Sequence, residues 1–488
     1  MRYIGIAEGK HDAALAIVTA NGDIEYASHA ERFEKQKIYP HLTDNLVSMV
    51  EDSDQIFFYA DQMQYLRGNK KEWRMWIDRR EGAPPPLGWR PQRRWLREQD
   101  IMHHECHAAA AYYTRPWASS DDTVIVTIDG AGESQSCTIS DSNFNILYEE
   151  TIPISIGMMY AAVTLELGLT PLHDEYIVMG MASFGEPVDV AALDEIEQAS
   201  LNYWQNGGTR QGYRQYTTYP LIRNMIKKYG PNNTAASLQT WTENRIIEIM
   251  KRARKIGKKL VYSGGVAQNI MANTLIHSMF DEVWIDVNPT DGGAALGAAA
   301  RGYCLENKKD RINYVDPYLG TMGSVRDFSP KMVAQHLVKW HMCGVIHGRS
   351  EYTPRALGNR SLLANPLIDI KDTVNKVKKR QKFRPFAPAI LEEFVDEYFE
   401  GPTSRYMQYT AKALHDYRSV THVDGTARVQ TVPSESKSIL RPILEEFYSM
   451  TGIPMLLNTS LNVRGKPMAD DHEDGLIFRE QTGVKVFG

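Results

Sequence analysis

The segment "MHHECHAAAAYY", residues 102–113, places three histidines directly before a run of alanines. Alanine is the strongest helix former, so we expect this segment to be helical. Residues four apart lie on one face of a helix, which puts the imidazoles of His103 and His107 side by side. Two such histidines are half of a metal site. Without oxygen ligands from elsewhere, they are only the polar start of an ordinary helix.

Two aspartates are candidates for those oxygen ligands. Asp129 ends the apolar strand pattern "VIVTID", and Asp291 lies in the glycine-rich loop "NPTDGG". Strand ends are where α/β folds place their chemistry. Two histidines with one or two carboxylates suit Fe(II), Mn(II) or Zn(II), and the sequence does not choose among these ions. The alternative is that both aspartates only cap turns.

Three polar or glycine-rich turns are candidates for binding a nucleotide. The first holds His11 and Asp12, the second holds Gly130, and the third holds Gly264 and Gly265. Glycines at such turns let backbone N–H groups approach phosphate, and the dipole of a following helix adds to the attraction. Glycine turns occur throughout α/β proteins, so it is the order of the three along the chain that favours a nucleotide site.

The elements that carry these turns form a repeated pattern. The chain opens with "RYIGIAEG" and "AALAIVTA", and an Asn-Gly turn leads into a third strand. The same plan returns in "DDTVIVTIDGAG", "SQSCTIS" and "NILYEETI". A duplicated β-meander of this kind is expected of the actin-like or heat-shock-protein-like ATPase architecture, which is an α/β fold.

The rest of the chain indicates a second domain. Helical patterns dominate 156–258, and two strand–glycine turn–helix units follow. A polar stretch at 311–327 is typical of a linker. We therefore predict a first domain at 1–310 and a smaller α/β domain at 328–488. The length of 488 residues, too great for a single core, agrees with this division.

Composition narrows the class of protein. The chain is 43% hydrophobic and 24% charged, with a net charge of −5, so no overall basic field indicates a nucleic-acid partner. The opening segment meets charge too early for a secretory signal, and no apolar run is long enough to span a bilayer. The four cysteines form no CxxC pair, which is typical of reduced thiols. We expect a cytoplasmic protein with no membrane segment.

Longer motifs carry a resemblance to a known family. The first half contains "HHECHAAAAYY", "TIDGAGES" and "SGGVAQNIMAN", and the second contains "PRALGNRSLLANP", "FRPFAPAIL", "THVDGTARVQTV" and "LLNTSLNVRGKPM". In this order they resemble the O-carbamoyltransferases of the nodulation and antibiotic-tailoring type. The resemblance covers nearly the whole chain. It implies a first domain similar to tRNA threonylcarbamoyltransferases and a second similar to the synthase that makes their activated adenylate.

The family resemblance implies a reaction in two steps. The second domain would use ATP, with Mg(II), and carbamoyl phosphate to build carbamoyladenylate. Adenylate formation needs cations around polyphosphate. The resemblance assigns Lys378 and Arg380 to a Lys-x-Arg motif, and Ser460 and Asn462 to a Ser-x-Asn motif. Further arginines that can face phosphate are Arg355, Arg384 and Arg428.

The first domain would then transfer the carbamoyl group to an acceptor hydroxyl. The resemblance implies a metal, Fe(II) before Mn(II) or Zn(II), on His103, His107, Asp129 and Asp291. His11 is the candidate base, since a neutral imidazole is poised near working pH; alternatively it only bonds the backbone. The residues that would line the adenosine are Gly264, Gly265 and Asn269.

One turn departs from the family pattern. Thr353 stands where relatives usually carry glycine, just before "PRALGNRS". Threonine tolerates a positive φ poorly. We therefore expect this turn, and the placement of Arg355, to differ from the family.

The acceptor is not fixed by the donor motifs. Residues 67–97 hold ten Lys or Arg against three acids, with four of the nine tryptophans. Basic and aromatic residues interleaved in this way suit phosphate contacts and base stacking, unless they form only a solvated basic lobe. We favour a hydroxymethylated base such as 5-hydroxymethylcytosine in DNA. The alternatives are a sugar, aminoglycoside or other small alcohol, tRNA threonylcarbamoylation, or an inactive nucleotide-binding scaffold. The oligomeric state is left open, with a homodimer as one candidate.

Overall fold

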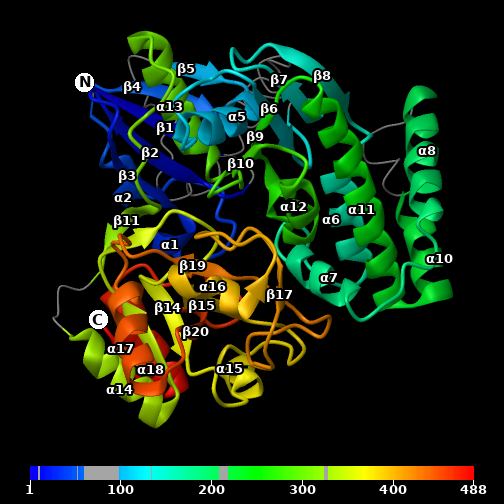
Figure 1. Cartoon of the computed structure of the whole chain (residues 1–488). Helices are drawn as coiled ribbons and strands as arrows, with labels where there is room; N and C mark the ends of the chain where they lie inside the picture. The colour runs from blue at the N-terminus through cyan, green and yellow to red at the C-terminus, as the bar shows by residue number, and fades with distance from the viewer. Residues whose placement is uncertain (9–10, 52, 60–97, 133, 208–217, 324–327) are drawn as a thin grey trace, which may run out of the picture. The chain divides into compact units, whose positions relative to one another are not determined.

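The computed structural model describes residues 1–488 except 9–10, 52, 60–97, 133, 208–217 and 324–327 (Figure 1). Its described residues form two compact units. The first unit comprises Met1–Tyr59, the strand that ends at Ile101, and Thr290–Gly488, and the second comprises Met102–Pro289. The domain limits at 310 and 328 stay a prediction.

The first unit begins with a five-stranded sheet in the order β3-β2-β1-β4-β5. Strands β1, β2 and β3 pair antiparallel as a meander, and β4 and β5 extend the sheet in parallel on the other side of β1. The turn between β2 and β3 contains Gly22 at a positive φ, as the Asn-Gly signal predicts. The strands are Arg2–Ala7, Ala14–Thr19, Ile24–His29, Gln55–Tyr59 and Glu98–Ile101.

The second unit contains a sheet with the same topology. Its order is β8-β7-β6-β9-β10, with β6, β7 and β8 antiparallel and β9 and β10 added in parallel beside β6. The repeat confirms the prediction of a duplicated β-meander and the α/β, actin-like fold class. The strands are Thr123–Ile128, Gln135–Ser140, Ile146–Thr151, Lys259–Ser263 and Glu282–Ile285.

Helix α13, Ala294–Asn307, covers the first sheet and packs closely on β1. Its sequence is rich in alanine and glycine, so the two backbones come near one another. A Cβ atom on Gly5 of β1 would overlap the carbonyl oxygen of Ala295. Small residues on both sides are therefore required by the packing. The short helices α1, Glu31–Glu34, and α2, Asp44–Val47, follow β3.

The second unit carries a helical layer beside its sheet, as the sequence predicts for 156–258 (Figure 1). The long helix α11 packs against α6, α7 and α12, and its Trp241 is fully buried. The helices are α5 His103–Thr114, α6 Ile156–Glu166, α7 Glu175–Ala182, α8 Ala191–Gln205, α10 Tyr219–Tyr229, α11 Pro231–Arg254, the 3₁₀ turn Gly265–Gln268 and α12 Ile270–His277.

The C-terminal part of the first unit is a mixed sheet in the order β19-β15-β20-β14-β12-β21. Its core joins Leu363, Leu456 and Phe447, among others. The strands are β12 Met342–Ile346, β14 Arg360–Ala364, β15 Ala387–Leu391, β19 Gln430–Val432, β20 Met455–Ser460 and β21 Val486–Phe487. The helices are α14 Pro330–Trp340, α15 Lys371–Val377, the 3₁₀ turn Glu392–Phe394, α16 Val395–Tyr398, α17 Leu440–Thr451 and α18 His472–Thr482.

Smaller strands complete this part. The predicted linker at 311–327 contains strand β11, which pairs antiparallel with β13. The ranges are β11 Tyr318–Met322, β13 Arg349–Glu351, β16 Phe399–Glu400, β17 Ala411–Ala413 and β18 Thr426–Ala427. Across the described helices, none combines the length and the apolar character needed to cross a membrane.

Candidate metal centre and candidate donor site

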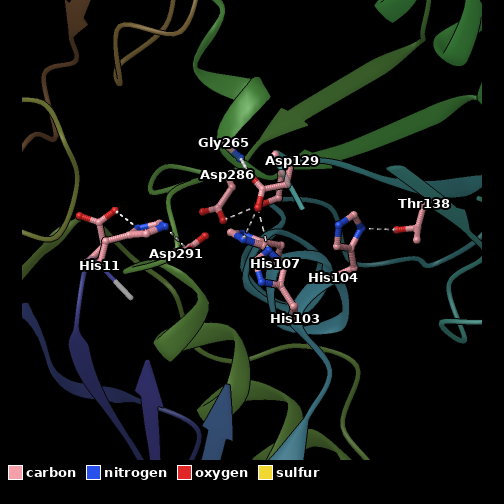
Figure 2. A network of polar contacts seen from close by, with 12 residues as sticks. His11, His103, His104, His107, Asp129, Thr138, Gly265, Asp286 and Asp291 are labelled. Atoms are coloured by element: carbon pink, nitrogen blue, oxygen red, sulfur yellow. Dashed lines mark hydrogen bonds and ion pairs between the residues drawn. The ribbon is translucent and has the colours of Figure 1, made fainter. Parts of the chain in front are cut away.

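The segment at 102–113 is helical, and its histidines lie as the sequence predicts. His103 and His107 are both buried on α5, with ring centroids 4.9 Å apart. His104 points elsewhere, and its Nδ1 lies 3.3 Å from Thr138 Oγ1 (Figure 2). The i, i+4 spacing therefore brings two imidazoles, and not the third, to one place.

Asp129 follows the end of β6 and meets these two histidines (Figure 2). Its Oδ2 lies 2.7 Å from His103 Nε2 and 3.8 Å from His107 Nε2. The ligand atoms of all three residues lie within 4.8 Å of one another. The other oxygen, Oδ1, accepts a hydrogen bond of 2.9 Å from the Gly265 N–H, which fixes the carboxylate plane. The chemistry of this donor set, two nitrogens and a carboxylate, suits a divalent transition metal.

The electrostatics of Asp129 favour its anionic form. Burial raises the pKa of this carboxyl, but the hydrogen bond with His103 and the charges of His103, His107 and His104 lower it more. The net result is a pKa well below the ordinary value. The lowered pKa favours the ionised carboxylate, which is the form that a candidate oxygen ligand needs.

Glycines allow the backbone to approach Asp129 from two sides. Gly264 has φ +91°, and a Cβ there would overlap the carbonyl oxygen of Ile128. A Cβ on Gly265 would lie 2.7 Å from Asp129 Oδ1, and one on Gly157 would lie 2.8 Å from Gly130 N. These glycines serve close packing around Asp129. Gly130 differs, because among the described residues no atom lies within 4 Å of a Cβ placed there, which leaves open space beside this turn.

Asp286 was missed by the sequence analysis. It follows the end of β10, is 6% exposed, and accepts hydrogen bonds from Ser263 Oγ at 2.8 Å and from the Asn288 N–H at 3.0 Å. Burial raises the pKa of its carboxyl, and the hydrogen bonds from Asn288 and Ser263, with a smaller contribution from His107, partly offset this shift. The available signal was the repeated ending "WID" after "TID": both strands are parallel to β9, so both aspartates come to one sheet edge.

Asn269 has a structural role that the sequence analysis did not foresee. Its side chain caps α12 by accepting the Ala272 N–H at 3.1 Å. Its amide group also exchanges hydrogen bonds with Gln239, at 3.0 and 3.1 Å. Both ends of the amide are thus used, and contact with adenosine stays a prediction.

His11, Asp12 and Asp291 come together in the first unit. His11 Nδ1 lies 3.0 Å from Asp12 Oδ2, and His11 Nε2 lies 3.4 Å from Asp291 Oδ2 (Figure 2). Asp291 stands just before α13, and its carbonyl oxygen accepts the Ala294 N–H at 3.1 Å. A histidine with a carboxylate at each ring nitrogen is held in one orientation.

Lys378 lies in the first unit, where the ends of α15 and β20 meet. It is 4% exposed, and its Nζ donates to the Ser460 carbonyl, to Ser460 Oγ at 3.3 Å, and to the carbonyl and Oδ1 of Asn462 at 3.1 and 2.7 Å. Ser460 Oγ also donates to Asn462 Oδ1 at 2.8 Å. Residues more than 80 positions apart in the chain therefore meet at one ammonium group.

The charge around Lys378 is positive. Burial lowers the pKa of its amine well below the usual range, and Arg380, Arg384 and Lys37 lower it further. Arg380 is held by Asn375 Oδ1 at 2.6 Å and lies 4.1 Å from the ring centroid of Phe386. The four oxygen partners of the Lys378 ammonium are neutral, so the site favours an anion.

The turn before "PRALGNRS" accommodates threonine. Thr353 is buried, and it is not among the residues with positive φ. Its Oγ1 accepts the N–H of Arg355 at 3.1 Å, a bond that glycine does not offer. The expected departure is therefore a hydroxyl contact without backbone strain. Arg428 lies between β18 and β19, and the basic and aromatic segment at 67–97 lies outside the described residues.

Comparison with known proteins gives two family matches. A family described as "Carbamoyltransferase N-terminus" matches residues 94–300, and "Carbamoyltransferase C-terminus" matches 334–487. Nodulation protein NolNO of Sinorhizobium fredii is 32% identical over 77% of this chain, which spans 61% of that protein. Nodulation protein NolO of Bradyrhizobium diazoefficiens is 30% identical over 77% of this chain and 75% of its own length.

Solved structures resemble the chain only loosely. Component A of the Acidaminococcus fermentans (R)-2-hydroxyglutaryl-CoA dehydratase has a TM-score of 0.36 at 14% identity, covering 63% of this chain and 99% of its own. HypF of T. kodakarensis has a TM-score of 0.33 at 11% identity, covering 63% and 48%. Scores this low carry no argument about activity.

Proposed function

Because the chain belongs to the carbamoyltransferase family, we propose that it makes carbamoyladenylate from ATP and carbamoyl phosphate and transfers the carbamoyl group to an acceptor hydroxyl. The observation that carries this proposal is the meeting of Lys378, Ser460 and Asn462 in a cationic, buried place. A site that builds an adenylate must hold polyphosphate, and buried cations with fixed hydrogen-bonding groups do so.

The donor step uses the positive charge around Lys378. Water first cleaves carbamoyl phosphate into carbamate and inorganic phosphate. An oxygen of the carbamate then attacks the α-phosphorus of ATP, so that carbamoyladenylate forms and pyrophosphate leaves. Lys378, Arg380 and Arg384 repel one another in the free protein, so an anionic ligand relieves their repulsion. Arg355 and Arg428 are proposed to contact the remaining phosphate oxygens, and Mg(II) enters with the ATP.

The transfer step is assigned to His103, His107 and Asp129, with Asp291 as fourth ligand. The nitrogen and oxygen donors fit a divalent metal, and we propose Fe(II), with Mn(II) and Zn(II) as alternatives. When bound, the metal supplies Lewis-acid polarisation of the carbamoyl oxygen.

In the transfer step the acceptor oxygen bonds the carbamoyl carbon, and AMP leaves as the bond from that carbon to its phosphate oxygen breaks. His11 is proposed to take the proton of the acceptor hydroxyl. Asp12 at Nδ1 and Asp291 at Nε2 can each accept the hydrogen of the neutral ring, and Asp12 is the nearer of the two. We propose that the hydrogen stays on Nδ1 and that Nε2 accepts the proton. The adenosine end of the donor is proposed to lie along Gly130, Gly264, Gly265 and Asn269. The room beside Gly130 supports this placement.

The proposed acceptor is a hydroxymethylated base such as 5-hydroxymethylcytosine in DNA. Its support is the ten Lys or Arg and four tryptophans of 67–97. A sugar, an aminoglycoside or another small alcohol is the alternative. Mass spectrometry of each acceptor, after incubation with protein, ATP and carbamoyl phosphate, tests the proposal. A gain of one carbamoyl group on DNA and not on sugars is expected, and the reverse result would establish the alternative.

Two other candidate functions can be distinguished from carbamoyl transfer by the products that they form. A tRNA-threonylcarbamoylating enzyme would add a heavier group to tRNA, which the product mass distinguishes. A nucleotide-binding scaffold would release no pyrophosphate from ATP and carbamoyl phosphate in the absence of acceptor. Release of pyrophosphate under those conditions is the outcome that we expect.

A further inference from the structure

Tyr352 links two loops that are distant in sequence. It lies on the loop 352–359, between β13 and β14, which also carries Arg355. The tyrosine is 3% exposed, and its hydroxyl donates a hydrogen bond to the carbonyl oxygen of Gly292. Its own N–H donates to the Pro317 carbonyl at 2.7 Å. Tyr352 therefore connects the loop that carries Arg355, a residue proposed to bind phosphate, with Gly292, the residue that follows Asp291.

The loop that carries Tyr352 is held firmly. Glu351 Oε1 accepts the N–H groups of Leu357 and Asn359, both at 2.9 Å, and of Arg360 at 3.2 Å. Arg32 of α1 donates to the carbonyls of Glu351 and Thr353. Several buried hydrogen bonds to one short loop fix its backbone. Tyr352 therefore presents its hydroxyl from a rigid support.

The turn that Tyr352 contacts has little freedom on its other side. A Cβ on Gly292 would overlap the ring of His29, and the His29 ring centroid lies 5.0 Å from that of Tyr352. The turn closes through hydrogen bonds from Gly293 N–H to Thr290 O at 2.9 Å and from Ala294 N–H to Asp291 O at 3.1 Å. The carbonyl of Gly292 is the polar group of this turn to which the Tyr352 hydroxyl donates.

We propose that Tyr352 is a positioning residue for the transfer step, which holds the Asp291 carboxylate in place through the Gly292 carbonyl. The inference rests on the proposed function, in which Asp291 is a metal ligand. It deepens that function, because Tyr352, from the part of the chain proposed to form carbamoyladenylate, sets the position of Asp291, a proposed metal ligand of the transfer step. In this proposal Tyr352 acts on the site only through the Gly292 carbonyl and binds neither the metal nor the substrate itself.

The chain offers a matched control. Tyr318 of β11 donates its hydroxyl to the Leu357 carbonyl at 3.1 Å, and so holds the same loop without contacting Gly292. Tyr352→Phe and Tyr318→Phe each delete one hydroxyl and one hydrogen bond to a carbonyl. Only the first releases the turn of Asp291. A general loosening of the loop should appear in both variants.

The test uses Mn(II) as the probe on the full chain. Calorimetric titration measures Mn(II) affinity, pyrophosphate release measures the donor step, and transfer is followed at rising Mn(II). For Tyr352→Phe we expect Mn(II) binding to weaken by about tenfold, the scale on which ligand-supporting residues act. Pyrophosphate release should match wild type, and excess Mn(II) should restore transfer. Tyr318→Phe should bind Mn(II) as wild type does.

Each contrary result has a distinct meaning. Equal Mn(II) affinity in Tyr352→Phe and wild type would overturn the inference and leave the proposed function standing. Equal weakening in both tyrosine variants, or parallel loss of pyrophosphate release, would overturn it by showing a general support of the loop. Absence of Mn(II) binding by wild type, repeated with Fe(II) and Zn(II), would remove the metal from the proposed function and this inference with it.

Discussion

At the candidate metal centre a buried carboxylate is surrounded by imidazoles, whereas at the candidate donor site a buried ammonium is surrounded by neutral oxygens. Asp129 is stabilised as an anion by His103 and its neighbours. Lys378 is destabilised as a cation by burial and by two arginines. Before any ligand binds, the carboxylate of the candidate metal centre is already stabilised as an anion. The candidate donor site, by contrast, carries positive charge that no nearby acid compensates among the described partners of Lys378. The difference indicates a cation for the first place and a polyanion for the second.

The most direct test of this comparison is to remove a proposed ligand from the candidate metal centre alone. Replacing His103 with alanine removes one proposed ligand and the partner of Asp129. We expect transfer to be abolished and pyrophosphate release to be retained, because the two steps use different residues. His104→Ala is the control on the same helix, since its ring points toward Thr138. Unchanged transfer by His103→Ala, measured as carbamoylated product, would contradict the assignment.

The complementary change removes the central cation of the candidate donor site. Lys378→Ala removes the ammonium that Ser460 and Asn462 hold. Pyrophosphate release and transfer from ATP and carbamoyl phosphate should both fall below detection, while transfer from supplied carbamoyladenylate should continue. Lys382→Ala, at a side chain 82% exposed, should behave as wild type. Failure of the supplied intermediate in a folded Lys378→Ala protein would mean that the roles are wrongly divided.

A third set of substitutions tests whether the segment 67–97 binds a DNA acceptor. Charge reversal at Arg93 and Arg94 should flatten the salt dependence of DNA modification, and the slope should fall by roughly one for each phosphate that is no longer bound. Trp89→Ala or Trp95→Ala should cost about 1–3 kcal/mol if the ring stacks on a base. Pyrophosphate release should be unaffected. Overlapping salt curves for wild type and the Arg93/Arg94 variant would remove the nucleic-acid acceptor.

The smallest expected effect concerns stability. Lys378→Met removes the buried amine and, with it, the pH-dependent part of its contribution to stability. The folded-state pKa of Lys378 is lowered, so the unfolded chain binds more protons between that pKa and about 10.4. Wild-type stability should therefore rise with pH in this window, and the rise should be smaller in Lys378→Met. Urea unfolding at several pH values measures both; parallel curves would contradict the prediction.

Local signals predicted the elements well. The His103/His107 spacing, the Asn-Gly turn and the repeated strand–turn–strand plan each depend on neighbours in sequence, and the structure confirms them. Asp286 was missed because its importance comes from a parallel strand more than 150 residues after β6. The hydrogen bonds between Asn269 and Gln239 were missed for a similar reason, since the two residues lie 30 positions apart. The cap that Asn269 forms on α12 joins residues only three apart, and it was a local signal left unused.

Long-range contacts explain what remained beyond the sequence. The family motifs indicated Lys378, Ser460 and Asn462, but only the folded chain shows that they share hydrogen bonds. The hydrogen bonds from Arg32 to the Glu351 and Thr353 carbonyls cross more than 300 positions, and no local pattern marks them. Thr353 is a different case, because its hydroxyl contacts the N–H of Arg355 only two residues later, which is a local threonine turn.

The close packing of α13 on β1 has a consequence for how this chain tolerates variation. Asp291 stands just before the first turn of α13, and that helix rests against Gly5 with no space for a methyl group. A side chain added at Gly5 would push the helix outward and carry the carboxylate with it. Positions that never meet a ligand can thus be as intolerant of change as those that do. The small side chains of α13 set the distance between this helix and β1, and that distance determines the position of the Asp291 carboxylate.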